Sequence, residues 1–101
     1  MLKHEKQRGT VTVALSGDLD HHTAAQIRRE LDGLIADPGV RRLVFDLSGL
    51  GFMDSSGIGM ILGRYRTMMM RGGTVAVRPG CRQVDRMIEL SGLYQIIEKL
   101  A

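Results

Sequence analysis

Two helical patterns alternate with short apolar runs along this chain, and this alternation restricts the fold more than any other feature. Apolar residues recur at spacings of three and four over 24–35 and over 58–69, which predicts two amphipathic helices. Short runs rich in valine and leucine lie before, between and after them, at 11–15, 43–47 and 74–77. Strand, helix and strand joined by short connections form parallel pairs with right-handed crossovers. The sequence therefore predicts an α/β fold.

Weaker patterns complete the expected element order. A polar edge strand is expected at 2–8 and a third helix from about Arg82, while 93–97 fits a short strand and a helical turn equally well. The order is then β-β-α-β-α-β-α, with an optional last strand, in one domain over 1–101. The run Leu43-Val44-Phe45 is typical of a strand covered on both faces. The expected buried helical positions are Ala24, Ile27, Leu31, Leu34 and Ile35, then Ile58, Ile61, Leu62, Tyr65, Met68 and Met69, then Val84, Met87, Ile88 and Leu90.

Composition excludes several classes of protein. With 44% hydrophobic and 25% charged residues in 101 positions, the chain is expected to fold around one core. No apolar run approaches the ~20 residues that span a bilayer, and none near the start resembles a signal peptide. One cysteine excludes an internal disulfide, so a reducing cytoplasm is expected. The net charge of +3 is dispersed and aromatic residues make up only 4%, which argues against binding to nucleic acid.

Acidic and histidine residues follow the ends of two predicted parallel strands. Segments 17–22 and 48–54 are expected to be the connections from strand to helix, with Asp20 as a helix N-cap. Because the carboxyl ends of parallel strands meet at one edge of a sheet, both connections should emerge together. We therefore expect Asp18, Asp20, His21 and His22 to lie near Asp54 and Ser55.

No enzymatic motif explains the acidic, histidine and serine residues expected at this edge of the sheet. A nucleophile elbow needs glycine two residues before and after the serine, and neither Ser55 nor Ser56 has both. The chain lacks a Walker A loop, and Gly57-Ile58-Gly59 lacks the third glycine of a dinucleotide fingerprint. His21-His22 has no partner at a metal-ligand spacing, so we expect no metal and no cofactor. Cys81, just before the third helix, is more easily interpreted as a small capping residue than as a reactive thiol.

Ser55 is the remaining candidate, and two interpretations stay open. It can serve as a plain N-cap of the second predicted helix. It can also accept a phosphate, which the free N–H groups of a helix start would stabilise. Glycines just after it lower helix propensity, so Gly57 and Gly59 would serve close approach by another backbone. Met60 lies off the apolar stripe and is expected to be an exposed contact.

Two segments carry a family resemblance: Gly17-Asp18-Leu19-Asp20-His21-His22-Thr23-Ala24, and Phe52 through Tyr65 with its Asp-Ser-Ser-Gly motif. In these the chain resembles the STAS-domain anti-sigma-factor antagonists, in particular their sporulation branch. The resemblance implies a STAS fold, in which a mixed sheet of four to five strands carries helices mainly on one face. It also implies a cytoplasmic, non-enzymatic regulator.

The resemblance further implies a partner-switching cycle. The unphosphorylated antagonist binds an anti-sigma factor and frees the sigma factor. That anti-sigma factor is also a serine kinase that carries ATP or ADP; it phosphorylates Ser55 and so ends the binding, and a PP2C-type phosphatase reverses the reaction. Asp18 and Asp20 match acidic loop positions expected at the kinase interface. The full set of expected partner-binding residues is Asp18, Asp20, His21, Asp54, Ser56, Gly57, Ile58, Gly59 and Met60. An alternative is a STAS module of a stress-response or nucleotide-sensing system.

Overall fold

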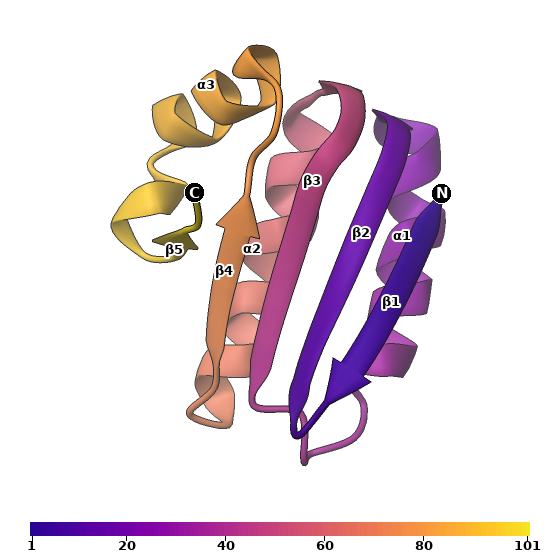
Figure 1. The fold of residues 1–101 in the computed structure, drawn as a ribbon, viewed down its shortest axis with the longest axis vertical. Coiled ribbons are helices and arrows are strands. Elements are labelled where there is room, and N and C mark those ends of the chain that lie inside the picture. The colour runs from indigo at the N-terminus through magenta and orange to yellow at the C-terminus, as the bar shows by residue number, and fades with distance from the viewer.

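Strands and helices alternate along the chain in the predicted order in the computed structural model, which describes residues 1–101 (Figure 1). The short C-terminal segment, which the sequence left undecided over 93–97, is a 3-10 turn followed by a two-residue strand. The elements are β1 (Leu2–Gln7), β2 (Thr10–Leu19), α1 (His21–Leu34), β3 (Arg42–Met53), α2 (Ser55–Met70), β4 (Thr74–Arg78), α3 (Arg82–Ser91), η1 (Leu93–Gln95) and β5 (Glu98–Lys99).

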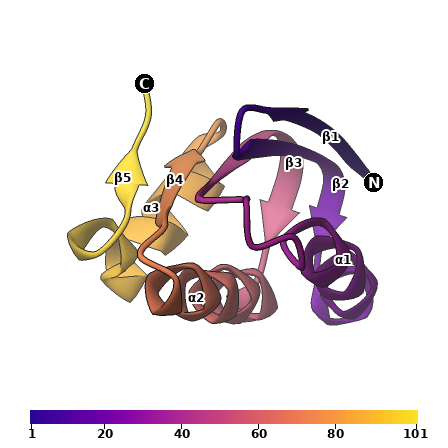
Figure 2. The ribbon, with the colours of Figure 1, turned by 90° about the horizontal axis from the view of Figure 1, so that it is seen from below.

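The sheet has the strand order β1-β2-β3-β4-β5, and the α/β architecture predicted from the sequence is confirmed. β1 pairs antiparallel with β2, whereas every other neighbouring pair is parallel. Helices α1 and α2 lie side by side under one face, and the other face carries no helix (Figure 2). The expectation that β3 is covered on both faces is therefore wrong. Val44 is still only 7% exposed, between its register partners Thr12 and Ala76 on the neighbouring strands.

The core lies between the sheet and the helices. Alternate residues of the central strands point into it, because side chains of a strand alternate between faces. Its members include Val11, Val13, Leu15, Ile27, Leu31, Leu43, Phe45, Leu47, Ile61, Met68, Val75, Val77, Val84 and Ile88, each 5% exposed or less. The expectation of burial is wrong for two residues: Met69 is 54% exposed and Leu90 is 73% exposed. Each lies at the end of its helix, and Leu90 is two positions from buried Ile88, which places it on the opposite side of α3.

The two strands that lead to the predicted edge are longer than the sequence indicates. β2 continues past Gly17 to Leu19, and β3 continues through 48–51 to Met53. The expected connection 48–54 is therefore mostly strand, and the expected connection 17–22 is half strand, with α1 starting at His21. Their pairing carries two register shifts, as expected where glycines interrupt strands. A Cβ on Gly49 would lie 2.8 Å from the Leu15 carbonyl oxygen, so only glycine lets the two backbones approach this closely.

Helix ends are fixed by caps and by one arginine. Gly72 takes the left-handed conformation (φ +72°) after α2. Arg71, the C-cap of α2, donates from Nη1 to the carbonyl oxygens of Ile35, Asp37 and Val40, at 2.8, 3.1 and 3.2 Å. The end of α2 therefore holds the connection from α1 to β3. None of the helices is long and apolar enough to cross a membrane.

Candidate functional site

The carboxyl ends of β2 and β3 lie side by side, which confirms that the two acidic segments share one edge of the sheet. Asp18 pairs with Phe52 and Leu19 pairs with Met53. The Asp54 N–H then donates to the Leu19 carbonyl oxygen at 3.1 Å. The starts of α1 and α2 are thus joined directly.

Asp20 is the N-cap of α1, as predicted, and forms a capping box. Its Oδ1 accepts from the N–H groups of His22 and Thr23, both at 3.0 Å, while its own N–H donates to Thr23 Oγ1 at 2.9 Å. The hydrogen bond from the Thr23 N–H is the main reason that the pKa of Asp20 is lowered from its usual 3.8. The Asp20 carboxylate is therefore a fixed negative charge beside His21.

Asp54 rather than Ser55 caps α2. Its Oδ1 accepts from the Ser56 N–H at 2.8 Å, and Ser55 is the first residue of the helix. The interpretation of Ser55 as a plain N-cap is therefore wrong. Ser55 is exposed, whereas Ser56 is half-buried. The two neighbouring hydroxyls are thus in different surroundings.

Gly57 and Gly59, which follow Ser56, have different surroundings. Gly57 is buried, and a Cβ on it would lie 2.5 Å from Met53 Cγ and 2.9 Å from Leu19 Cδ2. The close packing at Gly57 does require glycine, but the groups that lie against it are side chains of this protein and not another backbone. Gly59 is exposed, and a Cβ there would meet nothing within 4 Å.

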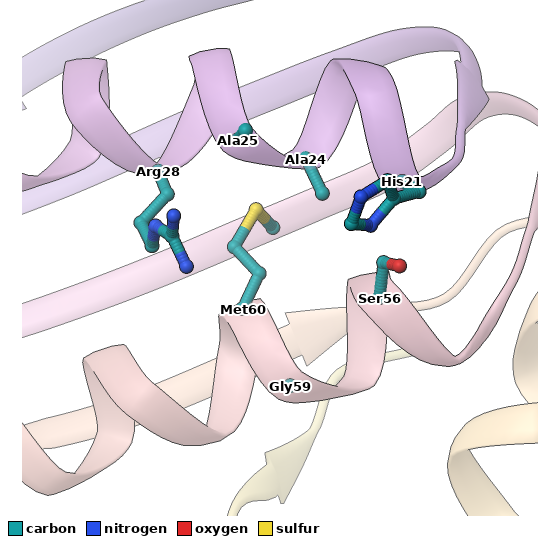
Figure 3. A pocket seen from close by; sticks show the side chains of 7 residues that line it. All are labelled: His21, Ala24, Ala25, Arg28, Ser56, Gly59 and Met60. Atoms are coloured by element: carbon teal, nitrogen blue, oxygen red, sulfur yellow. The ribbon is translucent and has the colours of Figure 1, made fainter.

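The side chain of Met60 is buried at the interface of α2 with α1. Only 3% of the residue is exposed, so the expectation of an exposed contact is wrong. Met60 points from α2 across to α1 (Figure 3), because its side of α2 faces a second helix rather than solvent. Ile58 is half-buried and packs against the edge of the core.

A pocket of about 320 Å³ lies between the two helices (Figure 3). It brings together four predicted site residues, and its walls are formed by His21, Ala24, Ala25 and Arg28 of α1 and by Ser56, Gly59 and Met60 of α2. Asp18, Asp20, Asp54, Gly57 and Ile58 lie outside its walls. The sequence interpretation missed Arg28, although a spacing of seven from His21 places both on one side of a helix.

Gln83 is a second residue that the sequence interpretation missed. Its Oε1 accepts from the Met53 N–H at 3.1 Å, and its Nε2 donates to the Met53 carbonyl oxygen at 2.9 Å. The side chain thus ties α3 to the last residue of β3, directly before Asp54. No sequence signal distinguishes Gln83 from any polar residue in the first turn of an amphipathic helix.

Neither the His21-His22 pair nor Cys81 lies in a catalytic arrangement. His21 and His22 are exposed in the first turn of α1, with ring centroids 6.1 Å apart and edge to face. No group of three or more His, Cys, Asp or Glu side chains is placed to hold a metal ion. Cys81 is the partly buried N-cap of α3, and its side chain makes no capping hydrogen bond.

Comparison with known proteins identifies the family. The family model described as STAS domain matches residues 2–101. The chain belongs to the STAS-domain family. This STAS protein is 42% identical over 96 residues to an anti-sigma F factor antagonist of Paenibacillus polymyxa, covering 95% of the chain and 82% of the relative. It is 27% identical to an anti-sigma-B factor antagonist of Listeria monocytogenes, over 92% of the chain and 82% of that relative. The resemblance to the anti-sigma-factor antagonists, and to their sporulation branch, is confirmed.

Solved structures give the same result. The fold of this STAS protein matches the unphosphorylated form of the anti-sigma factor antagonist SpoIIAA with a TM-score of 0.87 at 31% identity, covering 100% of the chain and 89% of that structure. It matches the phosphorylated form of the Bacillus cell fate determinant SpoIIAA with a TM-score of 0.79 at 30% identity, covering 100% and 92%. The present fold therefore resembles both states of that protein.

Proposed function

We propose that this STAS protein is an anti-sigma-factor antagonist switched by phosphorylation of Ser55. Its unphosphorylated form binds an anti-sigma factor that is also a serine kinase, and thereby frees a sigma factor. The observation that carries this proposal is the placement of Ser55: an exposed hydroxyl at the first residue of α2, at an edge where two helix starts meet.

Exposure selects Ser55 over Ser56. A kinase must bring the acceptor hydroxyl into line with the γ-phosphate of its ATP, which requires an accessible side chain. Ser55 meets that requirement. Ser56 is half-buried and lines the pocket opposite α1, where His21 lies across from it (Figure 3).

A phosphate on Ser55 acts on the partner rather than on the fold. It adds about −1.5 to −2 charges. The start of α2 stabilises an anion, although the Asp54 carboxylate already occupies the Ser56 N–H there. The added charge therefore accumulates beside Asp54 on an exposed surface and repels a partner that fits the uncharged serine. The similarity of this fold to both states of SpoIIAA supports a switch of this kind.

The remaining parts of the cycle follow from this assignment. ATP and ADP belong to the kinase, and a PP2C-type phosphatase restores the serine. This chain itself is a regulator and not an enzyme, works in the cytoplasm, and reaches the gene through the sigma factor without touching nucleic acid. The binding surface comprises the expected residues that are not buried, Asp18, Asp20, His21, Asp54, Ser56, Ile58 and Gly59.

A phosphorylation assay tests the acceptor. The protein is incubated with its cognate anti-sigma kinase and ATP, and the product is measured by intact mass and peptide sequencing. One phosphate is expected, on Ser55. Ser55→Ala should abolish it and Ser56→Ala should retain it. Phosphate on Ser56, or none, would contradict the assignment.

A binding assay tests how the switch works. Calorimetry with the anti-sigma factor should show weakened binding for Ser55→Asp, while Ser55→Asn, which is of similar size but uncharged, should lose much less. Equal affinities of Ser55→Asp and the unmodified protein would exclude charge repulsion as the mechanism.

A further inference from the structure

The pocket between α1 and α2 is bordered by one guanidinium, that of Arg28, which takes part in none of the ion pairs of the protein. Three polar side chains border it: the imidazole of His21, the guanidinium of Arg28 and the hydroxyl of Ser56 (Figure 3). Its other walls are small or apolar residues. The ion pairs of the protein lie elsewhere, between Lys6 and Asp37, Arg42 and Glu98, Arg64 and Asp32, and Lys99 and Asp85.

The nearest carboxylate on the same side of α1 is already engaged. Asp32 lies four residues after Arg28, where it would ordinarily pair with it. Instead its Oδ1 lies 3.1 Å from Nε of Arg64, whose side chain is only 12% exposed. Nε and Nη1 of Arg64 are both buried and form no hydrogen bond, so the contact of Nε with Asp32 is an ion pair only. Along this helix interface, donors therefore exceed acceptors, and Arg28 is left without a partner.

The helix starts do not account for the charge. At α1 the backbone donors are taken by Asp20, and at α2 the Ser56 N–H is taken by Asp54. The positive charge of the pocket thus comes from the Arg28 side chain. An arginine beside a nonpolar wall is well suited to a carboxylate, which it can bind through two parallel hydrogen bonds.

We propose that this pocket receives an acidic side chain of the anti-sigma factor. The inference rests on the proposed function and names the chemistry of that same surface. The Arg28 guanidinium binds the carboxylate, Ser56 Oγ and the His21 ring provide further donors, and Met60 with the alanines forms the apolar wall. A partner is favoured over a free anion because the pocket is continuous with the Ser55 edge: His21 and Ser56 belong to both.

This arrangement sharpens the regulation. Asp18, Asp20 and Asp54 lie outside the pocket, whereas Arg28 lines it, and such a separation of charge helps to orient a complementary partner. Ser55 directly precedes Ser56 of the pocket wall. In this proposal a phosphate on Ser55 adds negative charge one residue away from the pocket wall, near the bound carboxylate of the partner, and so weakens the complex.

Two charge reversals on α1 provide a matched test. Arg28→Glu and Arg29→Glu make the same change at neighbouring exposed positions, but only Arg28 lines the pocket. Affinity for the anti-sigma factor is measured by calorimetry, and thermal unfolding by circular dichroism confirms that both variants fold. We expect Arg28→Glu to weaken binding about tenfold or more and Arg29→Glu to change it by about twofold or less, since charges at a rim contribute little.

A compensating change identifies the ligand. Replacement of the contacting Glu or Asp of the anti-sigma factor by Arg should restore binding to Arg28→Glu. Equal losses for both reversals, or no loss for Arg28→Glu, would overturn the proposal while leaving the proposed function intact. If the unmodified protein did not bind the anti-sigma factor, the proposed function itself would fail. Saturable binding of ATP or inorganic phosphate that Arg28→Glu removes and the anti-sigma factor displaces would show a small-anion site instead, and would also overturn the proposal.

Discussion

The side-chain amide of Gln83 forms with the Met53 peptide the two hydrogen bonds that a neighbouring strand would otherwise form. The distances are 3.1 Å to the Met53 N–H and 2.9 Å from Nε2 to its carbonyl oxygen. β4 pairs with β3 only as far as Asp46 and Arg78, so that side of β3 has no strand partner near its end. Helix α3 thus contributes to the position of Asp54 and Ser55.

Gln83→Met should loosen this corner. The side chains have similar length, but methionine leaves both polar groups of Met53 without their partner, at a cost of about 1–2 kcal/mol in the free energy of unfolding. Denaturant unfolding measures this loss, and phosphorylation of Ser55 should slow. Gln83→Glu retains the acceptor for the Met53 N–H and should have a smaller effect. Unchanged stability and phosphorylation in Gln83→Met would show that the amide does not position the site.

Gly57 and Gly59, two of the three glycines of α2, should respond oppositely to alanine. Gly57→Ala places a Cβ 2.5 Å from Met53 Cγ and should destabilise the protein by about 1–3 kcal/mol through overpacking. Gly59→Ala meets nothing within 4 Å and should stabilise it by up to about 1 kcal/mol through helix propensity. Thermal unfolding of both variants measures the difference. Equal effects would mean that the crowding at Gly57 relaxes without cost.

Arg71→Met should weaken the connection between α1 and β3. The variant removes one guanidinium that donates to three carbonyl oxygens, and hydrogen bonds from a charged donor contribute about 1.5–3 kcal/mol. A loss of about 2 kcal/mol is expected in urea unfolding. Arg66→Met is the control, because Arg66 is an exposed residue of the same helix. Matching losses in the two variants would exclude a specific role for Arg71.

Acid should destabilise the fold through several aspartates. The pKa of Asp85 is lowered from 3.8, first by the Tyr94 hydroxyl at 2.6 Å and then by Lys99, and that of Asp46 is lowered mainly by the Ser48 hydroxyl. Because the folded-state pKa values lie below the unfolded ones, this stabilisation is complete above about pH 4 and is lost as pH falls through the lower values. Urea midpoints between pH 5 and 2.5 should decrease. In Asp85→Asn the urea midpoint should decrease less between pH 5 and 2.5. A pH dependence of the midpoint identical to that of the unmodified protein would contradict the role of Asp85.

The sequence predicted element types better than it predicted ends and exposure. Periodicity identified the helices because their apolar faces rest on one sheet, and Asp20 carries a local capping signal that tertiary contacts do not change. The ends of β2 and β3 were missed because their glycines suggest a loop, while the pairing of Leu19 with Met53 that keeps the strands extended is non-local. Met60 was misjudged for a similar reason, since its burial depends on α1. Gln83 and Arg28 reach the site only through packing of separate helices.

The two halves of strand β3 have different neighbours. Over 42–46, β3 has strands on both sides, whereas from Gly49 to Met53 it pairs only with β2 and is closed on the other side by one side chain. Local opening is easiest where few backbone hydrogen bonds must break. The end that carries Asp54 and Ser55 should therefore open more easily than the other half of the same strand, which is paired on both sides.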